Sequence, residues 1–164
     1  MSKCIYIISV IVLLAGCMSA PAKEPGDLAK ARAIINSCAY ASLATCEGDQ
    51  PRVRPVSVFS CDDGSFLVAT VTKTRKVEQL KNNPKVELCF VDDRHRQVRI
   101  QGRAELVESI EEKGRLMKQY LSAAMWSQYF KGPDDPLFAL YRIRPEHMEW
   151  MDSGQIFYRP VDLK

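Results

Sequence analysis

Short runs of alternating apolar and polar residues recur along most of the chain and predict β-strands. In the run from 96 to 108, Val98, Ile100, Ala104 and Leu106 share one face, and mostly polar residues fill the other. Further strand-like runs cover residues 40–46, 52–60, 65–72, 86–91, 137–143 and 148–151, with a shorter one at 155–158. Gly102 interrupts the long run, which predicts a bulge or sharp bend there.

Helical spacing of apolar residues occurs in four segments between these runs. The first is predicted from Leu28 to about Ser37, with Asp27 as its N-cap. The others cover residues 74–82, 109–121, which opens with a Ser-x-x-Glu capping box, and 123–129. Together with tight turns such as 62–64, this order predicts a mainly β fold with α: six or seven antiparallel strands in a small barrel, with peripheral helices.

The segment 70–76 passes from a strand into a helix and carries an unusual number of cations. Thr74 stands at the expected N-cap, where its hydroxyl can accept a hydrogen bond from a first-turn N–H. Lys73, Arg75 and Lys76 crowd into the same turn, although cations are unfavourable at the positive end of a helix dipole unless an anion meets them. This predicts a phosphate site, and the alternative is a solvated basic turn.

The first residues resemble a bacterial lipoprotein signal peptide. A short positive start precedes an apolar run from Ile5 to Gly16, which is too short to cross a bilayer. The run ends in Leu14-Ala15-Gly16-Cys17, which resembles the lipobox, so residues 1–16 would be removed and Cys17 lipidated. Residues 17–26 would then be a tether, and residues 27–164 one domain held to a membrane outside the cytoplasm. The alternative is an ordinary signal peptide that contains a cysteine.

Charge and cysteine content exclude several classes of function. The net charge is +3, or +2 without Lys3, so the overall field does not favour a polyanion, and no nucleic-acid motif is present. No cysteine pair or histidine has the spacing of metal ligands, so we expect no metal. Cys38, Cys46, Cys61 and Cys89 remain in the domain, and their pairing is left open.

Several motifs together resemble the flavin-binding split barrels of the pyridoxamine phosphate oxidase superfamily, and within it the general stress protein branch. The matching segments, in order, are 41–45 (ASLAT), 52–56 (RVRPV), 74–76 (TRK), 96–100 (RQVRI), 102–105 (GRAE), and Trp126, Phe130, Gly132, 134–136 (DDP) and 149–150 (EW). The resemblance runs from about Asp27 to Trp150 and implies a homodimer that binds flavin mononucleotide (FMN) between its subunits.

The resemblance also implies roles for individual residues. Arg54, Arg75 and Lys76 would hold the FMN phosphate beside the helix start at Thr74, while Thr70 and the backbone near Val56 and Ala69 would line the ribityl chain and ring. Gln97 would reach the ring edge, and Trp150 would close the pocket. The alternatives are solvated surface for Arg54, an ordinary polar strand position for Gln97, and core or dimer packing for Trp150.

Some positions depart from the true oxidase. Phe59 replaces a flavin-contacting lysine, Ala69 replaces an aromatic residue, and the Arg-Leu-His substrate segment is not found before Lys164. Pyridoxamine phosphate oxidation is therefore not expected. The leading hypothesis is an FMN-dependent oxidoreductase of unknown substrate, with no side chain assigned as acid or base. The alternatives are a non-catalytic flavin-binding or storage protein and, ranked last, a haem-binding split barrel.

Overall fold

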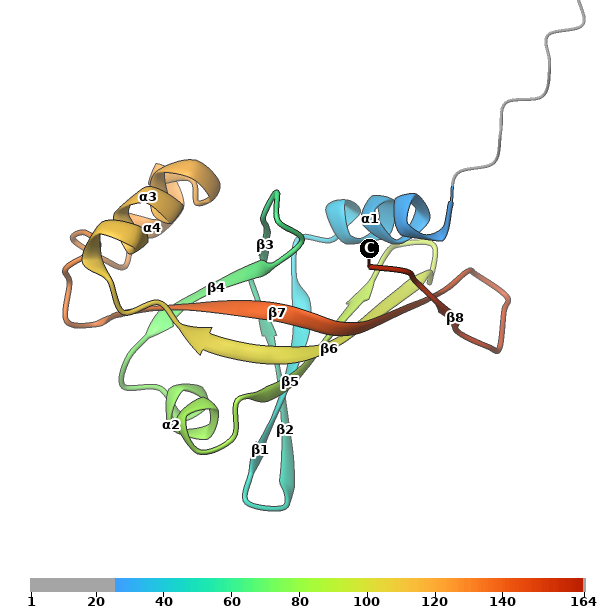
Figure 1. The fold of residues 1–164 in the computed structure, drawn as a ribbon, viewed down its shortest axis with the longest axis horizontal. Coiled ribbons are helices and arrows are strands. Elements are labelled where there is room, and N and C mark those ends of the chain that lie inside the picture. The colour runs from blue at the N-terminus through green and yellow to red at the C-terminus, as the bar shows by residue number, and fades with distance from the viewer. Residues whose placement is uncertain (1–25, 164) are drawn as a thin grey trace, which may run out of the picture.

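The computed structural model describes residues 26–163, in which one antiparallel sheet dominates (Figure 1). Its main strands run in the spatial order β2-β1-β5-β6-β7-β4-β3, and β8 pairs with β7. Their bounds are β1 Ala41–Glu47, β2 Gln50–Val56, β3 Phe59–Ser60, β4 Phe66–Val71, β5 Lys85–Val91, β6 Gln97–Leu106, β7 Phe138–Met151 and β8 Arg159–Pro160. The sheet curls into an open half-barrel, as the strand pattern predicted.

The bend predicted at Gly102 is confirmed. The β6–β7 register shifts between Gln101 and Gly102, so that Gly102 faces Pro145 while Gln101 faces His147. A Cβ at position 102 would lie against the backbone carbonyl of Arg144. Only glycine permits this close approach. The bulge bends β6 and β7 at the same point, and this bend curls the sheet.

Two helices pack against the concave side of the sheet. Helix α1 (Asp27–Ser37) buries Ala31, Ile34 and Ile35, and α2 (Arg75–Asn82) buries Val77 and Leu80. These side chains join the barrel core with the inward residues of β1 and β4–β7, including Leu88 and Ile100, which are fully buried. The predicted apolar stripes of both helices are thus confirmed.

A second, smaller core lies on the other face of β4 and β7. Leu67, Phe138 and Leu140 point to this side and pack against α3 (Ile110–Tyr120) and the segment that contains α4 (Ala123–Trp126). The side chain of Ser109 caps α3 by accepting a hydrogen bond from the Glu112 N–H at 3.2 Å, as the capping box predicted. Strand β7 therefore has apolar residues on both faces in its first half.

Several element boundaries differ from the sequence prediction. The two runs at 137–143 and 148–151 form the single strand β7, and the run at 52–60 is divided into β2 and β3. Residues 155–158 are not a strand, since the short β8 begins at Arg159. The helix predicted at 123–129 ends at Trp126. Asp27 does not cap α1: Gly26 is the N-cap, and the Asp27 carboxylate instead accepts a hydrogen bond from Trp150.

Among residues 26–163, no helix is long and apolar enough to cross a membrane. The predicted signal peptide, the lipidation site at Cys17 and nearly all of the tether lie outside the described residues. Within those residues, Cys38, Cys46, Cys61 and Cys89 are free thiols.

The turn between β5 and β6 depends on a buried carboxylate, which leads to a stability prediction. The Asp92 side chain is 1% exposed and pairs with the Arg96 guanidinium at 2.7 Å, while it also accepts the N–H groups of Arg94 and Arg96. Burial alone would raise the pKa of Asp92, but these hydrogen bonds outweigh it and hold the pKa below the ordinary value of 3.8. We expect Asp92→Asn to lower the free energy of unfolding at pH 7 by about 2–4 kcal/mol.

The sign of the pH dependence follows from the lowered pKa. The unfolded carboxyl takes up a proton first as the pH falls, so the stabilisation is complete well above pH 3.8 and is lost as the pH falls through the lower folded pKa. Urea unfolding of both proteins at pH 7 and near pH 3 should show the gap between them narrowing in acid. An equal gap at both pH values would contradict this account.

Candidate functional site

The start of α2 lies beside the end of β4, as the pattern of residues 70–76 predicted. The Lys76 ammonium donates to the Thr70 hydroxyl at 2.7 Å, which holds the lysine side chain over the end of the strand. Thr74 is the N-cap with extended backbone, but its hydroxyl donates to the Val71 carbonyl at 2.9 Å and caps no first-turn N–H. The position of the cap was predicted correctly, and the predicted capping hydrogen bond was wrong.

Arg54 is held by a network that joins two strands to α2. Its Nη1 donates to the Thr45 hydroxyl at 2.6 Å and to the Leu43 carbonyl at 3.2 Å, and its Nη2 donates to Gln79 Oε1 at 2.7 Å. Thr45 in turn donates to the same Gln79 oxygen at 2.7 Å. Thr45 and Gln79 are buried, so the network orients the Arg54 guanidinium before any ligand arrives.

Arg75 is the most exposed of the predicted phosphate ligands. Its side chain is 73% exposed and its Nη2 pairs with Glu47 at 2.8 Å. The same carboxylate oxygen also pairs with Arg52 at 2.8 Å, so one acidic group at the end of β1 bridges two arginines. The hydrogen bond from Arg75 is the largest cause that lowers the pKa of Glu47.

The cations of this region outnumber the anions. Arg52, Arg54, Arg75 and Lys76 line one hollow of about 380 Å³ together with Thr74 and Gln79, and we call this hollow the cationic pocket. Burial lowers the pKa of Lys76, and the nearby charge of Arg54 lowers it further. The pKa of Arg54 is likewise lowered, first by burial and then by Arg52 and Arg75. An anion in the pocket would relieve this mutual repulsion.

A larger and more apolar cleft of about 620 Å³ adjoins the cationic pocket. Val56, Ala69 and Thr70 line it from the sheet, and residues from 122 to 130 line it from the α4 segment, including Trp126, Tyr129 and Phe130. Thr74 and Lys76 line both the cleft and the cationic pocket. The two hollows are therefore joined at the start of α2, where an apolar space meets a cationic one.

The structure brings together seven of the nine predicted site residues: Arg54, Val56, Ala69, Thr70, Thr74, Arg75 and Lys76. Gln97 and Trp150 lie elsewhere in the same chain. Gln97 Oε1 accepts a hydrogen bond from the Tyr158 hydroxyl at 2.6 Å beside β8. Trp150 is 2% exposed in the barrel core, and its indole donates to Asp27 at 3.0 Å, which matches the packing alternative.

Sequence reasoning assigned no role in the site to several of its residues. Gln79 lies on the buried side of α2, and a polar residue within an apolar stripe was the available signal. Glu47 and Arg52 lie on either side of the hairpin turn at Gly48-Asp49, and charged residues near such turns are commonplace. Tyr40, Trp126, Tyr129 and Phe130 come from distant segments, and no local pattern brings them to the cleft.

Comparison with known proteins agrees with this architecture. The family model described as pyridoxamine 5'-phosphate oxidase matches residues 28–152. General stress protein 26 of Bacillus subtilis (strain 168) is 29% identical over 127 residues, which are 75% of this chain and 85% of that protein.

Two solved structures share the fold and differ in what their descriptions say they bind. A pyridoxamine 5'-phosphate oxidase-related, FMN-binding protein of Nostoc punctiforme superposes with a TM-score of 0.62 at 18% identity, over 82% of this chain and 84% of that one. A haem-binding protein of Mycobacterium smegmatis superposes with a TM-score of 0.70 at 19% identity, over 85% of this chain and 60% of that one. At these identities the likeness concerns the fold alone.

Proposed function

The chain belongs to the pyridoxamine 5'-phosphate oxidase family, and from this premise we propose that it binds FMN across the cleft and the cationic pocket. One observation carries the proposal: Lys76 and Thr74 line both hollows, so a ligand with a flat ring and a phosphate can occupy both at once. The FMN-binding relative of the same fold supports this choice of ligand.

The residues present fit both halves of FMN. The cleft volume of about 620 Å³ lies within the range of cofactor pockets, and its walls combine aromatic rings with the Thr70 hydroxyl. The Lys76 ammonium offers the phosphate a point charge, and the planar Arg75 guanidinium offers it two parallel N–H donors. Arg54 adds a third positive charge to the same pocket. When bound, the flavin would supply the hydride or electron transfer, and the chain would bind and orient it.

We further propose that the protein is an FMN-dependent oxidoreductase with a small-molecule substrate that is not pyridoxamine phosphate. The visible absorption spectrum of the purified protein tests the cofactor directly, because flavin and haem have different bands. Oxidation of NAD(P)H by the loaded protein with any acceptor would support the enzyme. A flavin spectrum with no turnover would instead favour the non-catalytic binding or storage protein.

The haem-binding structure makes haem the second candidate ligand. The absorption spectrum also tests haem binding. The positions of the two histidines count against a haem ligand. His95 lies in the turn after β5 and His147 on β7, and neither lines the apolar cleft. A haem spectrum would overturn the FMN proposal.

We propose a homodimer because the cleft is open on one side. Tyr40 and Tyr129 on its rim are 64% and 66% exposed and line the same cleft, so they offer a second copy an aromatic surface to cover. A second copy would cover the rim. Light scattering after gel filtration should give twice the mass of the chain, and a monomeric mass would contradict the dimer.

We also propose that Cys17 carries a lipid that anchors the protein to a membrane outside the cytoplasm. The support is the Leu-Ala-Gly-Cys segment after an apolar run. Cys17→Ser should move the protein from the membrane fraction to the soluble fraction. Persistent membrane attachment of this variant would count against lipidation there.

A further inference from the structure

Thr45 and Gln79 hold one end of the Arg54 guanidinium, and we call these three residues the arginine triad. A guanidinium can only donate, so the Gln79 atom that lies 2.7 Å from Arg54 Nη2 is the amide oxygen. Thr45 Oγ1 accepts from Arg54 Nη1 at 2.6 Å, and its own hydrogen goes to the same Gln79 oxygen at 2.7 Å. The polar hydrogens between the three side chains are therefore assigned by the network itself.

The contacts of the arginine triad leave one edge of the guanidinium free. Nη1 and Nη2 donate side by side to two oxygens that are hydrogen-bonded to each other, and the other Nη1 hydrogen goes to the Leu43 carbonyl at 3.2 Å. Within residues 26–163, no hydrogen bond or ion pair uses the Nε–H or the second Nη2–H of Arg54. These two N–H groups are parallel neighbours on one edge, the arrangement that binds two oxygens of a phosphate.

Burial of the two acceptors keeps this orientation fixed. Thr45 and Gln79 are 2% and 3% exposed and come from β1 and α2, whereas Arg54 comes from β2. Arg54 and Gln79 also line the cationic pocket, so the arginine triad forms part of its wall. A guanidinium that is already held in place loses less side-chain freedom when a ligand binds, which favours affinity.

We propose that Thr45 and Gln79 are positioning residues, which hold Arg54 so that its free edge binds the phosphate of the flavin in the cationic pocket. This role, which rests on the FMN binding proposed above, adds two residues that act on the phosphate through Arg54. Loss of either acceptor should therefore weaken the hold on the phosphate and leave the binding of the flavin ring in the apolar cleft unchanged.

Gln79→Leu tests this role, because leucine keeps much of the side-chain volume and removes the shared acceptor. Titration of the purified protein with FMN and, separately, with riboflavin measures the two affinities. We expect Gln79→Leu to weaken FMN binding about tenfold and to leave riboflavin binding unchanged. Thr45→Val, which removes the hydroxyl at nearly the same volume, should have the same selective effect, and it serves as the test if the Gln79 variant does not fold. Equal weakening of both flavins would indicate a merely structural role and would overturn the proposal.

A double-mutant cycle shows whether Gln79 acts through Arg54. Arg54→Met removes the donors that the arginine triad positions, so adding Gln79→Leu to it should change FMN affinity by less than about twofold. A tenfold loss in both backgrounds would mean that Gln79 acts independently of Arg54, and a positioning role would be wrong.

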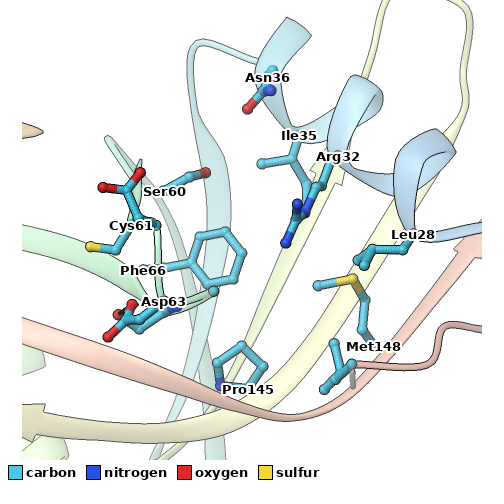
Figure 2. A pocket seen from close by; sticks show the side chains of 14 residues that line it. Leu28, Arg32, Ile35, Asn36, Ser60, Cys61, Asp63, Phe66, Pro145 and Met148 are labelled. Atoms are coloured by element: carbon cyan, nitrogen blue, oxygen red, sulfur yellow. Dashed lines mark hydrogen bonds between the residues drawn. The ribbon is translucent and has the colours of Figure 1, made fainter.

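Asn36→Leu is the matched control, since it makes the same kind of substitution on another helix. Asn36 is exposed on α1 at the rim of a separate cavity of about 410 Å³, which shares no lining residue with the cationic pocket (Figure 2). Its affinities for both flavins should equal those of the wild type, and a selective loss of FMN affinity would overturn the assignment to Gln79. Wild-type protein that bound no FMN would overturn both this role and the flavin proposal, whereas an unaltered Gln79 variant would overturn this role alone.

Discussion

Replacing Lys76 by Met should weaken FMN binding by roughly a hundredfold, the largest effect that we expect at this site. Among residues 26–163, Lys76 is the only cation that lines both the apolar cleft and the cationic pocket, so it lies where a ligand that occupies both would pass from one to the other. Its ammonium is partly buried, and a charge removed from water interacts more strongly with a phosphate than an exposed one does. Flavin fluorescence quenching during titration measures the affinity.

The stability of the Lys76 variant separates loss of ligand from loss of fold. Burial and Arg54 both lower the pKa of Lys76, so the charged lysine is mildly unfavourable in the protein without ligand. Lys76→Met should therefore leave the free energy of unfolding unchanged or raise it. Arg75→Ala is the comparison variant, and we expect it to have a smaller effect. It should weaken FMN binding only about tenfold, because the Arg75 side chain is exposed and Glu47 competes with the phosphate for it. An equal or larger effect at Arg75 would contradict this ranking.

Substitution of Gly102 by Ala should destabilise the fold by about 3 kcal/mol or more. The added methyl group would meet the Arg144 carbonyl and the Pro145 Cα, and these are backbone atoms that cannot rotate aside. The strands β6 and β7 would have to separate at the bulge that curls the sheet. Urea unfolding measures the change.

Gly26→Ala is the matched control, because a Cβ at position 26 would meet nothing within 4 Å and the backbone there has φ −63°. Because alanine is a poorer N-cap than glycine, its stability should fall by no more than about 1 kcal/mol. If Gly102→Ala were equally mild, the close approach of β6 to β7 would not be what shapes the half-barrel.

The elements that local pattern dictates were predicted well. The apolar stripes of α1 and α2 and the capping box of α3 depend on residues three or four positions apart, so the sequence displays them directly. The convergence of Thr70, Thr74 and Lys76 was also predictable, because a strand that runs straight into a helix keeps its last residues beside the first turn.

The continuity of β7 was not predictable in the same way. The sequence predicted two runs, 137–143 and 148–151, and Pro145 between them lacks the N–H that a ladder needs. In the structure Pro145 faces Gly102 at the bulge, where the regular pairing is already interrupted, and the strand continues through it. Only the register with β6 shows that the proline is tolerated there.

Contacts between distant segments account for the remaining differences. The Trp150 indole binds a carboxylate 123 positions away, and Glu47 meets Arg75 from the far end of a hairpin. The Thr74 hydroxyl can accept from a first-turn N–H or donate to the Val71 carbonyl, and in the structure it does the second. Sequence alone does not decide between such options.

The central claim is that Lys76, Arg75 and Arg54 bind the phosphate of a flavin whose ring occupies the apolar cleft. The most direct measurement compares the affinity of the purified protein for FMN with its affinity for riboflavin, which has the same ring and ribityl chain but no phosphate. This account predicts that FMN binds at least about a hundredfold more tightly and that Lys76→Met removes most of the difference. Equal affinity for the two flavins would contradict it.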